Sequence, residues 1–284
     1  MKKFAVMLSV LAGAILVISS VRAGAGDSRL ALDKRSAPDA RPAADRKSDE
    51  GKPIRVLFVL GSPPFHDIRK LPPILEKVLD QVGGFQVTRL EPPLDKPPDD
   101  PAHLAKLADI KRSDYDVLVF YTSRYQLNEL QERALEKFVE DGGGLVGIHG
   151  ASFSFSNSKV WMRLLGAQFT GHIPGTHPLN IDIADPKHPI MAGVEPFTIT
   201  DEEYKHKLAD VDRHVLARFR ERPPESDQKA NMDMIWTREV GKGRVFYCSL
   251  GHDKHAWTNP SWQKLVVQGI LWAAGRPREV QIPK

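Results

Sequence analysis

The sequence predicts an α/β fold with a doubly wound, mostly parallel sheet, and three observations support this prediction. Short apolar runs alternate with amphipathic segments along residues 54–276. The runs contain few polar residues, which is typical of strands that are covered on both faces. Strand and helix also follow each other at the spacing of right-handed crossovers between parallel strands. A segment of this length is enough for one domain with a substantial core.

The first strands and helices can be placed from apolar runs, turn residues and helix caps. Asn128 with Gln131 three residues later predicts a capped helix start, and Asp141-Gly142 predicts its end. The expected elements of this half are strands at 54–60, 85–90, 116–121 and 145–148, and helices at 71–82, 103–110 and between 128 and 141.

Beyond residue 151 the alternation of strand and helix becomes less regular. Gly241-Lys242-Gly243 predicts a tight turn into an apolar strand at 244–250. The other expected elements are a helix at 159–165, strands at 179–184, 197–200, 215–219 and 232–237, and a closing helix at 262–273. Residues 277–284 are expected to form a C-terminal tail after the domain at 54–276.

The N-terminal residues have the three parts of an export signal. Lys2 and Lys3 precede an apolar run, and Val21-Arg22-Ala23 places small residues where a signal peptidase cleaves. The apolar run is shorter than the roughly 20 residues that span a bilayer. We therefore expect a signal peptide at 1–23, a periplasmic or extracellular protein, and no stable membrane association after cleavage; an uncleaved anchor is the alternative. The composition of residues 24–53 predicts a disordered linker.

The charge of the chain argues against a nucleic-acid partner. The formal net charge is +4 at pH 7, and it falls to +1 when the three cations of the signal are removed. Nucleic-acid binding needs a concentrated basic face, which this sequence lacks. The single cysteine, Cys248, cannot form an internal disulfide, and its apolar surroundings predict a buried thiol. The sequence leaves the oligomeric state open.

Three histidines follow predicted strands and are the first candidates for chemistry: His66, His149 and His252. Because ligands bind beyond the carboxyl ends of strands in such sheets, we expect these imidazoles to converge at one edge. Gly150 follows His149 and allows the positive φ or the close approach that a sharp turn requires. The alternative is that His149 only forms a hydrogen bond within its loop.

Loops that could cover the same edge carry further candidates, namely His172, His177, Glu203 and Tyr204. Imidazoles beside a carboxylate suit either a divalent metal with an open coordination position or general acid-base catalysis. No HExxH-type spacing is present, so no cofactor is certain; the candidate metal ligands are His66, His149, His172 and His252. The indole of Trp257 could stack on a sugar ring or pack beneath its loop.

These motifs together resemble the ThuA-like (trehalose utilisation) family within the class I glutamine amidotransferase-like superfamily. The matching pieces, which span about residues 54–276, are Phe65-His66-Asp67, GGGLVGIHGA at 142–151, FTGH at 169–172, His188-Pro189-Ile190 with Gly193, DEEY at 201–204, GKGRVFY at 241–247 followed by LGHD, and GILWAAG at 269–275. The resemblance implies a flavodoxin-like sheet. His149 stands where the amidotransferase nucleophile would be a cysteine, which argues against glutamine hydrolysis.

The resemblance also implies an exported sugar-processing protein that acts on 3-keto sugars or 3-keto-glycosides, as a lyase, isomerase or hydrolase. In this hypothesis His149 or Glu203 moves a proton, while His66 and His252, or a divalent metal, polarise the ketone. His172, His177, Tyr204 and Trp257 are expected to bind the carbohydrate. Two alternatives remain open at this point: a carbohydrate-binding module without catalysis, and a metal-dependent hydrolase of another substrate class.

Overall fold

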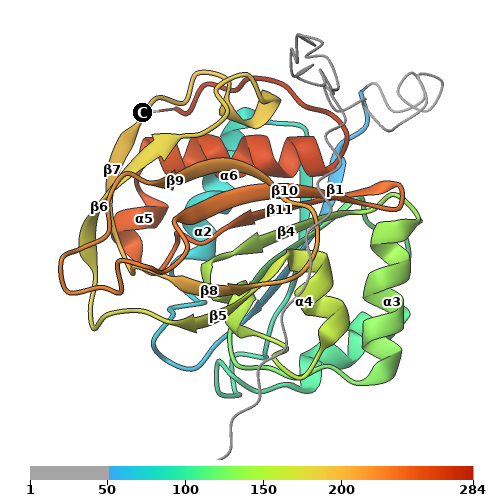
Figure 1. Cartoon of the computed structure of the whole chain (residues 1–284). Coiled ribbons are helices and arrows are strands. Elements are labelled where there is room, and N and C mark those ends of the chain that lie inside the picture. The colour runs from blue at the N-terminus through green and yellow to red at the C-terminus, as the bar shows by residue number, and fades with distance from the viewer. Residues whose placement is uncertain (1–50, 284) are drawn as a thin grey trace, which may run out of the picture. The chain divides into compact units, whose positions relative to one another are not determined.

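A nine-stranded mixed sheet forms the centre of the computed structural model, which describes residues 51–283 (Figure 1). The strand order is β2-β1-β3-β4-β11-β10-β9-β6-β7. The predicted signal peptide at 1–23 and nearly all of the predicted linker at 24–53 lie outside the described residues. Within the described residues no helix has the length and apolar character needed to cross a membrane.

Five neighbouring strands are parallel, and all of them were expected from the sequence. They are β1 (Ile54–Gly61), β2 (Phe85–Leu90), β3 (Val117–Thr122), β4 (Gly144–Ile148) and β11 (Gly243–Cys248). Each pairs in parallel with its neighbour in the sheet. The residues of β3, β4 and β11 are all buried, as their continuous apolar runs predict. These strands therefore end at a common edge.

The remaining four strands are antiparallel to their neighbours. They are β10 (Asp233–Val240), β9 (His214–Phe219), β6 (His177–Ile183) and β7 (Phe197–Asp201). The tight turn at Gly241-Lys242 joins β10 to β11, and a connection this short can only join antiparallel neighbours. The α/β class is thus confirmed, with a sheet that is mixed; the flavodoxin-like, doubly wound detail stays a prediction.

Two hydrophobic clusters lie between the sheet and its helices. Residues of α2 (Pro72–Val82) and α6 (Pro260–Ala273) belong to one cluster. Residues of α3 (Glu129–Glu140), α4 (Lys159–Leu165) and the 3-10 helix η1 (Ala102–Asp109) belong to the other. The predicted capping box at the start of α3 is present: Asn128 accepts from Gln131 N, and the Gln131 side chain accepts from Asn128 N.

Short elements surround the carboxyl ends of the parallel strands. The two-stranded sheet of β5 (Ala167–Gly171) and β8 (Lys205–Leu208) was not predicted, because both strands are short and β8 has a single apolar residue. The other short elements are the 3-10 helices η2 (His149–Phe153) and η3 (Pro189–Met191) and the helix α5 (Lys254–Trp257). Of these, η2 and α5 carry or adjoin predicted site residues.

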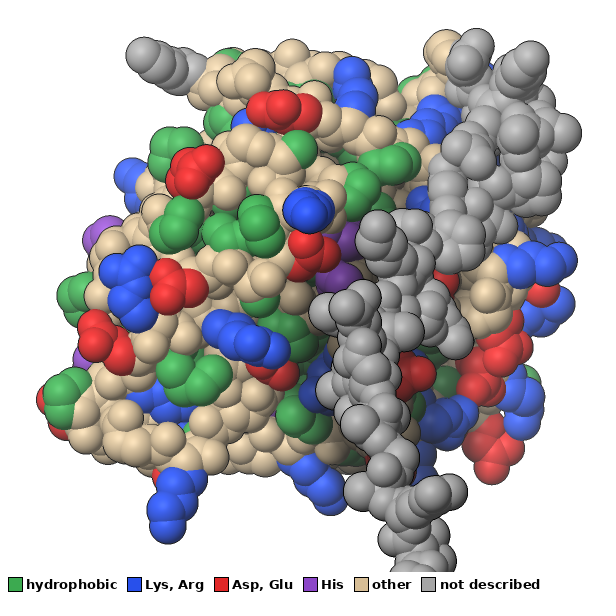
Figure 2. All heavy atoms as spheres, turned by 45° about the horizontal axis from the view of Figure 1, so that its top comes forward, with side chains coloured by type: hydrophobic (Ala, Val, Ile, Leu, Met, Phe, Trp, Pro, Cys, Tyr) green, Lys and Arg blue, Asp and Glu red, His purple; other side chains and the backbone are tan. Residues whose placement is uncertain are grey.

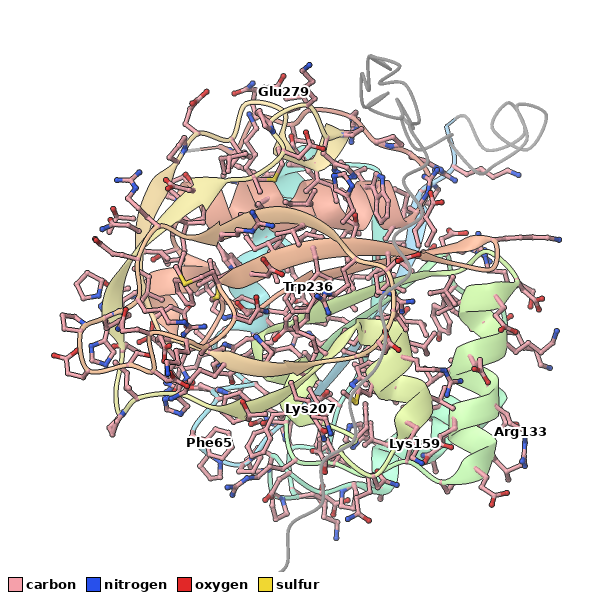
Figure 3. All side chains as sticks on the ribbon, viewed as in Figure 1. Phe65, Arg133, Lys159, Lys207, Trp236 and Glu279 are labelled. Atoms are coloured by element: carbon pink, nitrogen blue, oxygen red, sulfur yellow. The ribbon has the colours of Figure 1, made fainter. Side chains whose placement is uncertain are left out.

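On the face shown in Figure 2, hydrophobic side chains are scattered among charged ones. Figure 3 shows Trp236 enclosed among the strands, and its indole is completely buried. The side chains of Arg133, Lys159 and Lys207 are exposed on the surrounding elements. Phe65 is unusual among large hydrophobic residues because 42% of it is exposed.

Candidate active site

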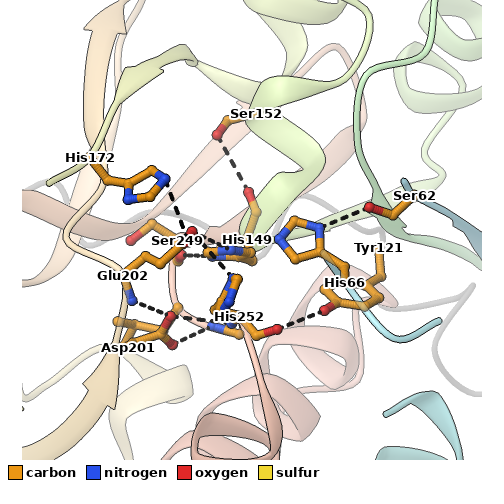
Figure 4. A network of polar contacts seen from close by, with 12 residues as sticks. Ser62, His66, Tyr121, His149, Ser152, His172, Asp201, Glu202, Ser249 and His252 are labelled. Atoms are coloured by element: carbon orange, nitrogen blue, oxygen red, sulfur yellow. Dashed lines mark hydrogen bonds and ion pairs between the residues drawn. The ribbon is translucent and has the colours of Figure 1, made fainter. Parts of the chain in front are cut away.

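Four side chains from distant parts of the sequence meet beyond the carboxyl ends of the strands (Figure 4). His66 follows β1, His149 follows β4, His252 follows β11, and Glu202 follows β7. One nitrogen or oxygen atom from each of them lies within 4.8 Å of the others. The three predicted imidazoles therefore do converge, and a carboxylate from the antiparallel half joins them. These four residues are called the His/Glu cluster below.

His149 is held in a defined orientation at the end of β4. Its φ is 46°, in the left-handed region that non-glycine residues seldom adopt. Its Nδ1 lies 2.7 Å from the carbonyl oxygen of Ser249, which can only accept, so Nδ1 donates. Its ring also stacks on Tyr204 at 4.1 Å. The other ring nitrogen, Nε2, is thereby directed at the cluster, 3.3 Å from Glu202 Oε2.

Gly150 allows the loops that carry His66 and His149 to approach each other. A Cβ at this position would lie 2.9 Å from the carbonyl oxygen of Thr122 and 3.0 Å from Cε1 of His66. The glycine is thus needed for close approach, and the positive φ of this turn belongs to His149 instead.

His66 is buried, and its Nδ1 lies 3.1 Å from Ser62 Oγ. The centroid of its ring is 4.8 Å from that of His149 and 5.2 Å from that of His252. Burial, followed by the repulsion of His149 and His252, lowers the pKa of His66 to about 2. The ring is therefore neutral at physiological pH, which is the form in which histidine binds metals.

Glu202 is the carboxylate of the cluster, and its Oε2 lies 3.3 Å from both His149 Nε2 and His252 Nδ1. Although burial opposes its ionisation, His149 and His252 hold the pKa of Glu202 well below its usual range. Glu202 in turn raises the pKa of His252 against the opposing effect of burial. The site thus contains a carboxylate that is ionised at neutral pH beside neutral His66.

Asp201 fixes the positions of two members of the cluster. Its buried carboxylate accepts hydrogen bonds from the backbone N–H groups of Glu202, Gly251 and His252, at 2.7, 2.6 and 3.2 Å. Burial raises its pKa. These bonds join the end of β7 to the loop after β11, so Asp201 holds Glu202 and His252 beside each other (Figure 4).

Two predicted site residues lie elsewhere than expected. The Glu203 side chain is fully buried, where it pairs with Arg222 and accepts from Ser226 Oγ, so Glu202 replaces it in the cluster. The indole of Trp257 is also fully buried, and its Nε1 donates to the carbonyl oxygen of Gly251. The prediction that Trp257 packs against a sugar ring is therefore wrong for this structure.

The other predicted residues lie around the cluster to different extents. His172 is at its rim, with Nε2 3.5 Å from Glu202 Oε1 and Nδ1 2.6 Å from the carbonyl oxygen of Ile173. Tyr204 is buried against His149. His177 is outside the cluster, on β6, and its Nε2 contacts the carbonyl oxygen of Pro174 at 3.0 Å.

The cluster has the donor set of a divalent metal site. Three imidazole nitrogens and one carboxylate oxygen suit Zn²⁺ and similar ions. His149 Nε2 and His252 Nδ1 are both buried, and each lies 3.3 Å from Glu202 Oε2 without hydrogen-bond geometry to any of the described residues. A bond from Nδ1–H of His149 to a backbone carbonyl is a common support for a metal-binding histidine. The residues present therefore fit a metal ion.

The side chains in and around the cluster differ in exposure. The His149 side chain is fully buried, whereas 20% of the His252 side chain and 29% of the His172 side chain are exposed. A ligand would therefore reach the cluster from the side of His172 and His252.

Comparison with solved structures supports the fold. A ThuA-like protein from Parabacteroides merdae has 21% identity and a TM-score of 0.68, over 82% of this chain and 94% of that one. A ThuA-like protein from Bacteroides uniformis has 16% identity and a TM-score of 0.57, over 78% and 93%. A cold-adapted β-galactosidase from Rahnella has 13% identity and a TM-score of 0.55, over 82% of this chain but 33% of that enzyme.

A search among curated proteins finds no match. The family model for ThuA, described as trehalose utilisation, matches residues 55–273, which include every member of the His/Glu cluster. This match covers most of the described residues, from β1 to the end of α6. The chain therefore belongs to the ThuA (trehalose utilisation) family.

Proposed function

We propose that this protein is an enzyme that acts on 3-keto sugars or 3-keto-glycosides, with His66, His149, Glu202 and His252 holding a divalent metal. The observation that carries the proposal is the convergence of these four side chains, in which two buried ring nitrogens face the Glu202 carboxylate at 3.3 Å without hydrogen-bond geometry. The description of the family as trehalose utilisation favours a sugar substrate. The His172 side chain, which lies 3.5 Å from Glu202 Oε1, is 29% exposed, so a ligand can reach this rim of the cluster.

A bound divalent metal would polarise the ketone oxygen and stabilise negative charge on it. The ketone acidifies the neighbouring C–H bonds, so a base can remove a proton from C2 or C4. His172 suits this role better than the buried His149, because its ring is partly exposed at the rim. Its Nδ1 faces the carbonyl oxygen of Ile173, which leaves Nε2 to accept the proton.

Two reactions can follow removal of the proton: isomerisation and elimination. After His172 removes the C2 proton, the electron pair forms an enolate with the C3 ketone. Return of the proton to C3, with transfer of the C2 hydroxyl proton to the C3 oxygen, gives the 2-keto isomer. Alternatively, the electron pair forms a C1–C2 double bond and expels the glycosidic oxygen from C1, which takes a proton from water. His172 is therefore the proposed general base, and the cluster orients the ketone.

The test is turnover of 3-keto-trehalose and 3-keto-glucose by the purified protein, with products identified by mass spectrometry and bound metal by elemental analysis. We expect His149→Ala to lose the metal and to lower turnover by about 100-fold or more. His177→Ala is the matched control, because His177 lies outside the cluster, and it should retain both. Equal turnover by His149→Ala and the unchanged protein would remove the cluster from the mechanism.

We also propose that the protein is exported and cleaved after Ala23, on the basis of the signal-like residues 1–23. The intact mass of protein from the periplasmic fraction should then correspond to a chain that begins at Gly24. Recovery of the full-length chain from the membrane fraction would favour the uncleaved anchor instead.

A further inference from the structure

An exposed arginine lies beside the cluster, between two aromatic rings. Arg124 follows β3, the strand that lies between β1 and β4 in the sheet. The centre of its guanidinium group is 5.5 Å from the ring centroid of Phe65 and 5.2 Å from that of Phe153. Arg124 itself is exposed, and 42% of Phe65 is exposed as well.

Both of these rings adjoin the candidate active site. Phe65 packs edge-on against His66, with ring centroids 4.7 Å apart. Phe153 contacts Phe169 at 4.8 Å, and Phe169 lies 5.9 Å from the ring of His172. One ring, that of Phe65, therefore lies between the guanidinium and the cluster. Two rings, those of Phe153 and Phe169, lie between the guanidinium and the proposed base.

The backbone around Arg124 is held in an uncommon conformation. Its φ is 64°, in the left-handed region that is unfavourable for a residue with a Cβ. The next residue, Tyr125, accepts a hydrogen bond at 2.7 Å from Phe155 N, which joins this loop to the one after β4. Such backbone conformations persist where the surrounding structure enforces them, and they are concentrated at functional sites.

The guanidinium of Arg124 has no acidic partner among residues 51–283; its contacts there are the two rings. Contacts of this kind use the π-faces of the rings and leave N–H donors of the guanidinium available. The planar group can donate two parallel hydrogen bonds to a carboxylate or a phosphate. An exposed arginine without a carboxylate partner, next to a catalytic cluster, is therefore suited to an anionic group of a ligand.

We propose that Phe65, Arg124 and Phe153 form an oxyanion subsite that binds a carboxylate or phosphate group on the sugar substrate. This inference rests on the proposed function for the reacting end of the substrate, and it adds that the substrate is an acidic sugar. The His/Glu cluster binds the ketone end, while Arg124 binds the charged group and sets the register of the sugar between them.

The test is the affinity of three sugars, measured by calorimetry at low salt. They are the methyl glycoside of glucuronic acid, which has a free carboxylate, glucose 6-phosphate, and the neutral methyl glucoside. We expect the unchanged protein to bind at least one anionic sugar about 10- to 100-fold more tightly than the neutral one. Arg124→Gln should abolish this difference. Arg133→Gln, an exposed arginine on α3 that pairs with Glu129, is the matched control and should retain it.

The outcomes identify the group that is bound. Preference for the glucuronate alone identifies a carboxylate, preference for the phosphate alone identifies a phosphate, and preference for both identifies a general oxyanion subsite. Equal affinity for neutral and anionic sugars, or a preference that persists in Arg124→Gln, overturns the proposal.

The same measurement on His149→Ala separates this inference from the proposed function. If the anion preference survives in His149→Ala but the unchanged protein turns over neither neutral 3-keto sugars nor 3-keto sugars with a carboxylate or phosphate, the subsite stands and the proposed reaction fails. If 3-keto sugars are turned over without any anion preference, the reaction stands and the subsite fails.

Discussion

The two halves of the sheet contribute different kinds of groups to the site. The parallel strands β1, β4 and β11 each end before one imidazole, so a simple rule of strand direction places all three. β7 is antiparallel to its neighbour β6 but runs in the same direction as β11, and it contributes Glu202 and Asp201 from the far edge of the sheet. The comparison shows that the three histidines come from the repeated strand–loop units of the parallel half. The positions of the two carboxylates depend instead on how the antiparallel half folds against the parallel one.

The largest expected effect is on the free energy of unfolding, and it distinguishes Glu203 from its neighbour Glu202 in the antiparallel half. Glu203→Ala leaves Arg222 buried without its partner, so we expect the free energy of unfolding to fall by about 3–5 kcal/mol. Glu202→Gln should instead lower metal affinity and reduce the free energy of unfolding by less, because glutamine keeps the size of the side chain and leaves no buried arginine unpaired. Urea unfolding and metal titration measure the two effects. Similar stability losses in both variants would contradict the separate roles given to these residues.

An intermediate effect is expected where the two halves are joined at Asp201. Asp201→Asn places an amide NH₂ against a backbone N–H donor, which costs about 1–3 kcal/mol of stability. Because Glu202 and His252 would then be held less firmly, metal affinity should also fall by about 10- to 100-fold. The control is Asp182→Asn, an exposed carboxylate on β6 that pairs with Arg220. Unchanged metal affinity in Asp201→Asn would show that Asp201 does not position the cluster.

The smallest effect is expected in the parallel half, at the end of the sheet opposite the cluster. Although burial opposes it, hydrogen bonds from Arg55 and Arg112 hold the pKa of Asp116 below its usual value. A carboxyl with a lowered pKa stabilises the folded state above its unfolded pKa of about 4, and this stability is lost as the pH falls. Since Arg55 is 37% exposed, water screens the pair, and we expect about 1 kcal/mol.

Urea unfolding at pH 7 and pH 3 measures this contribution of Asp116. The loss of stability between these two pH values should be about 1 kcal/mol smaller in Asp116→Asn than in the unchanged protein. An equal loss in both proteins would show that the ion pairs of Asp116 contribute nothing measurable.

The sequence predicts the parallel half well and the site only in part. Continuous apolar runs and glycine turns locate the strands that precede His66, His149 and His252. The choice between Glu202 and Glu203 could not be made from composition. Successive side chains of an extended segment point to opposite sides, so Glu202 faces the cluster and Glu203 faces Arg222. Only the register of β7 against β6, which is a tertiary feature, decides which side is which.

Trp257 shows a second limit of sequence reasoning. Its position after His252 is compatible with an exposed indole, yet the short helix α5 turns it inward between Tyr121 and Trp262. A four-residue helix has no hydrophobic periodicity from which its buried side could be read. Arg124 was not predicted as a site residue, and the signals that identify it, its φ and its two ring contacts, exist only in three dimensions.

The reactivity of the single cysteine can be used to measure local opening of the native structure. Cys248 lies fully buried at the end of β11, between Ile148 of β4 and Ile235 of β10, and burial raises its pKa. Cys248 belongs to the hydrophobic cluster that α6 shares with the sheet, and alkylating reagents need an accessible thiolate, so they can react only when this cover opens. The alkylation rate of the native protein therefore measures how often the core below the His252 loop opens, and a bound metal or sugar should slow it.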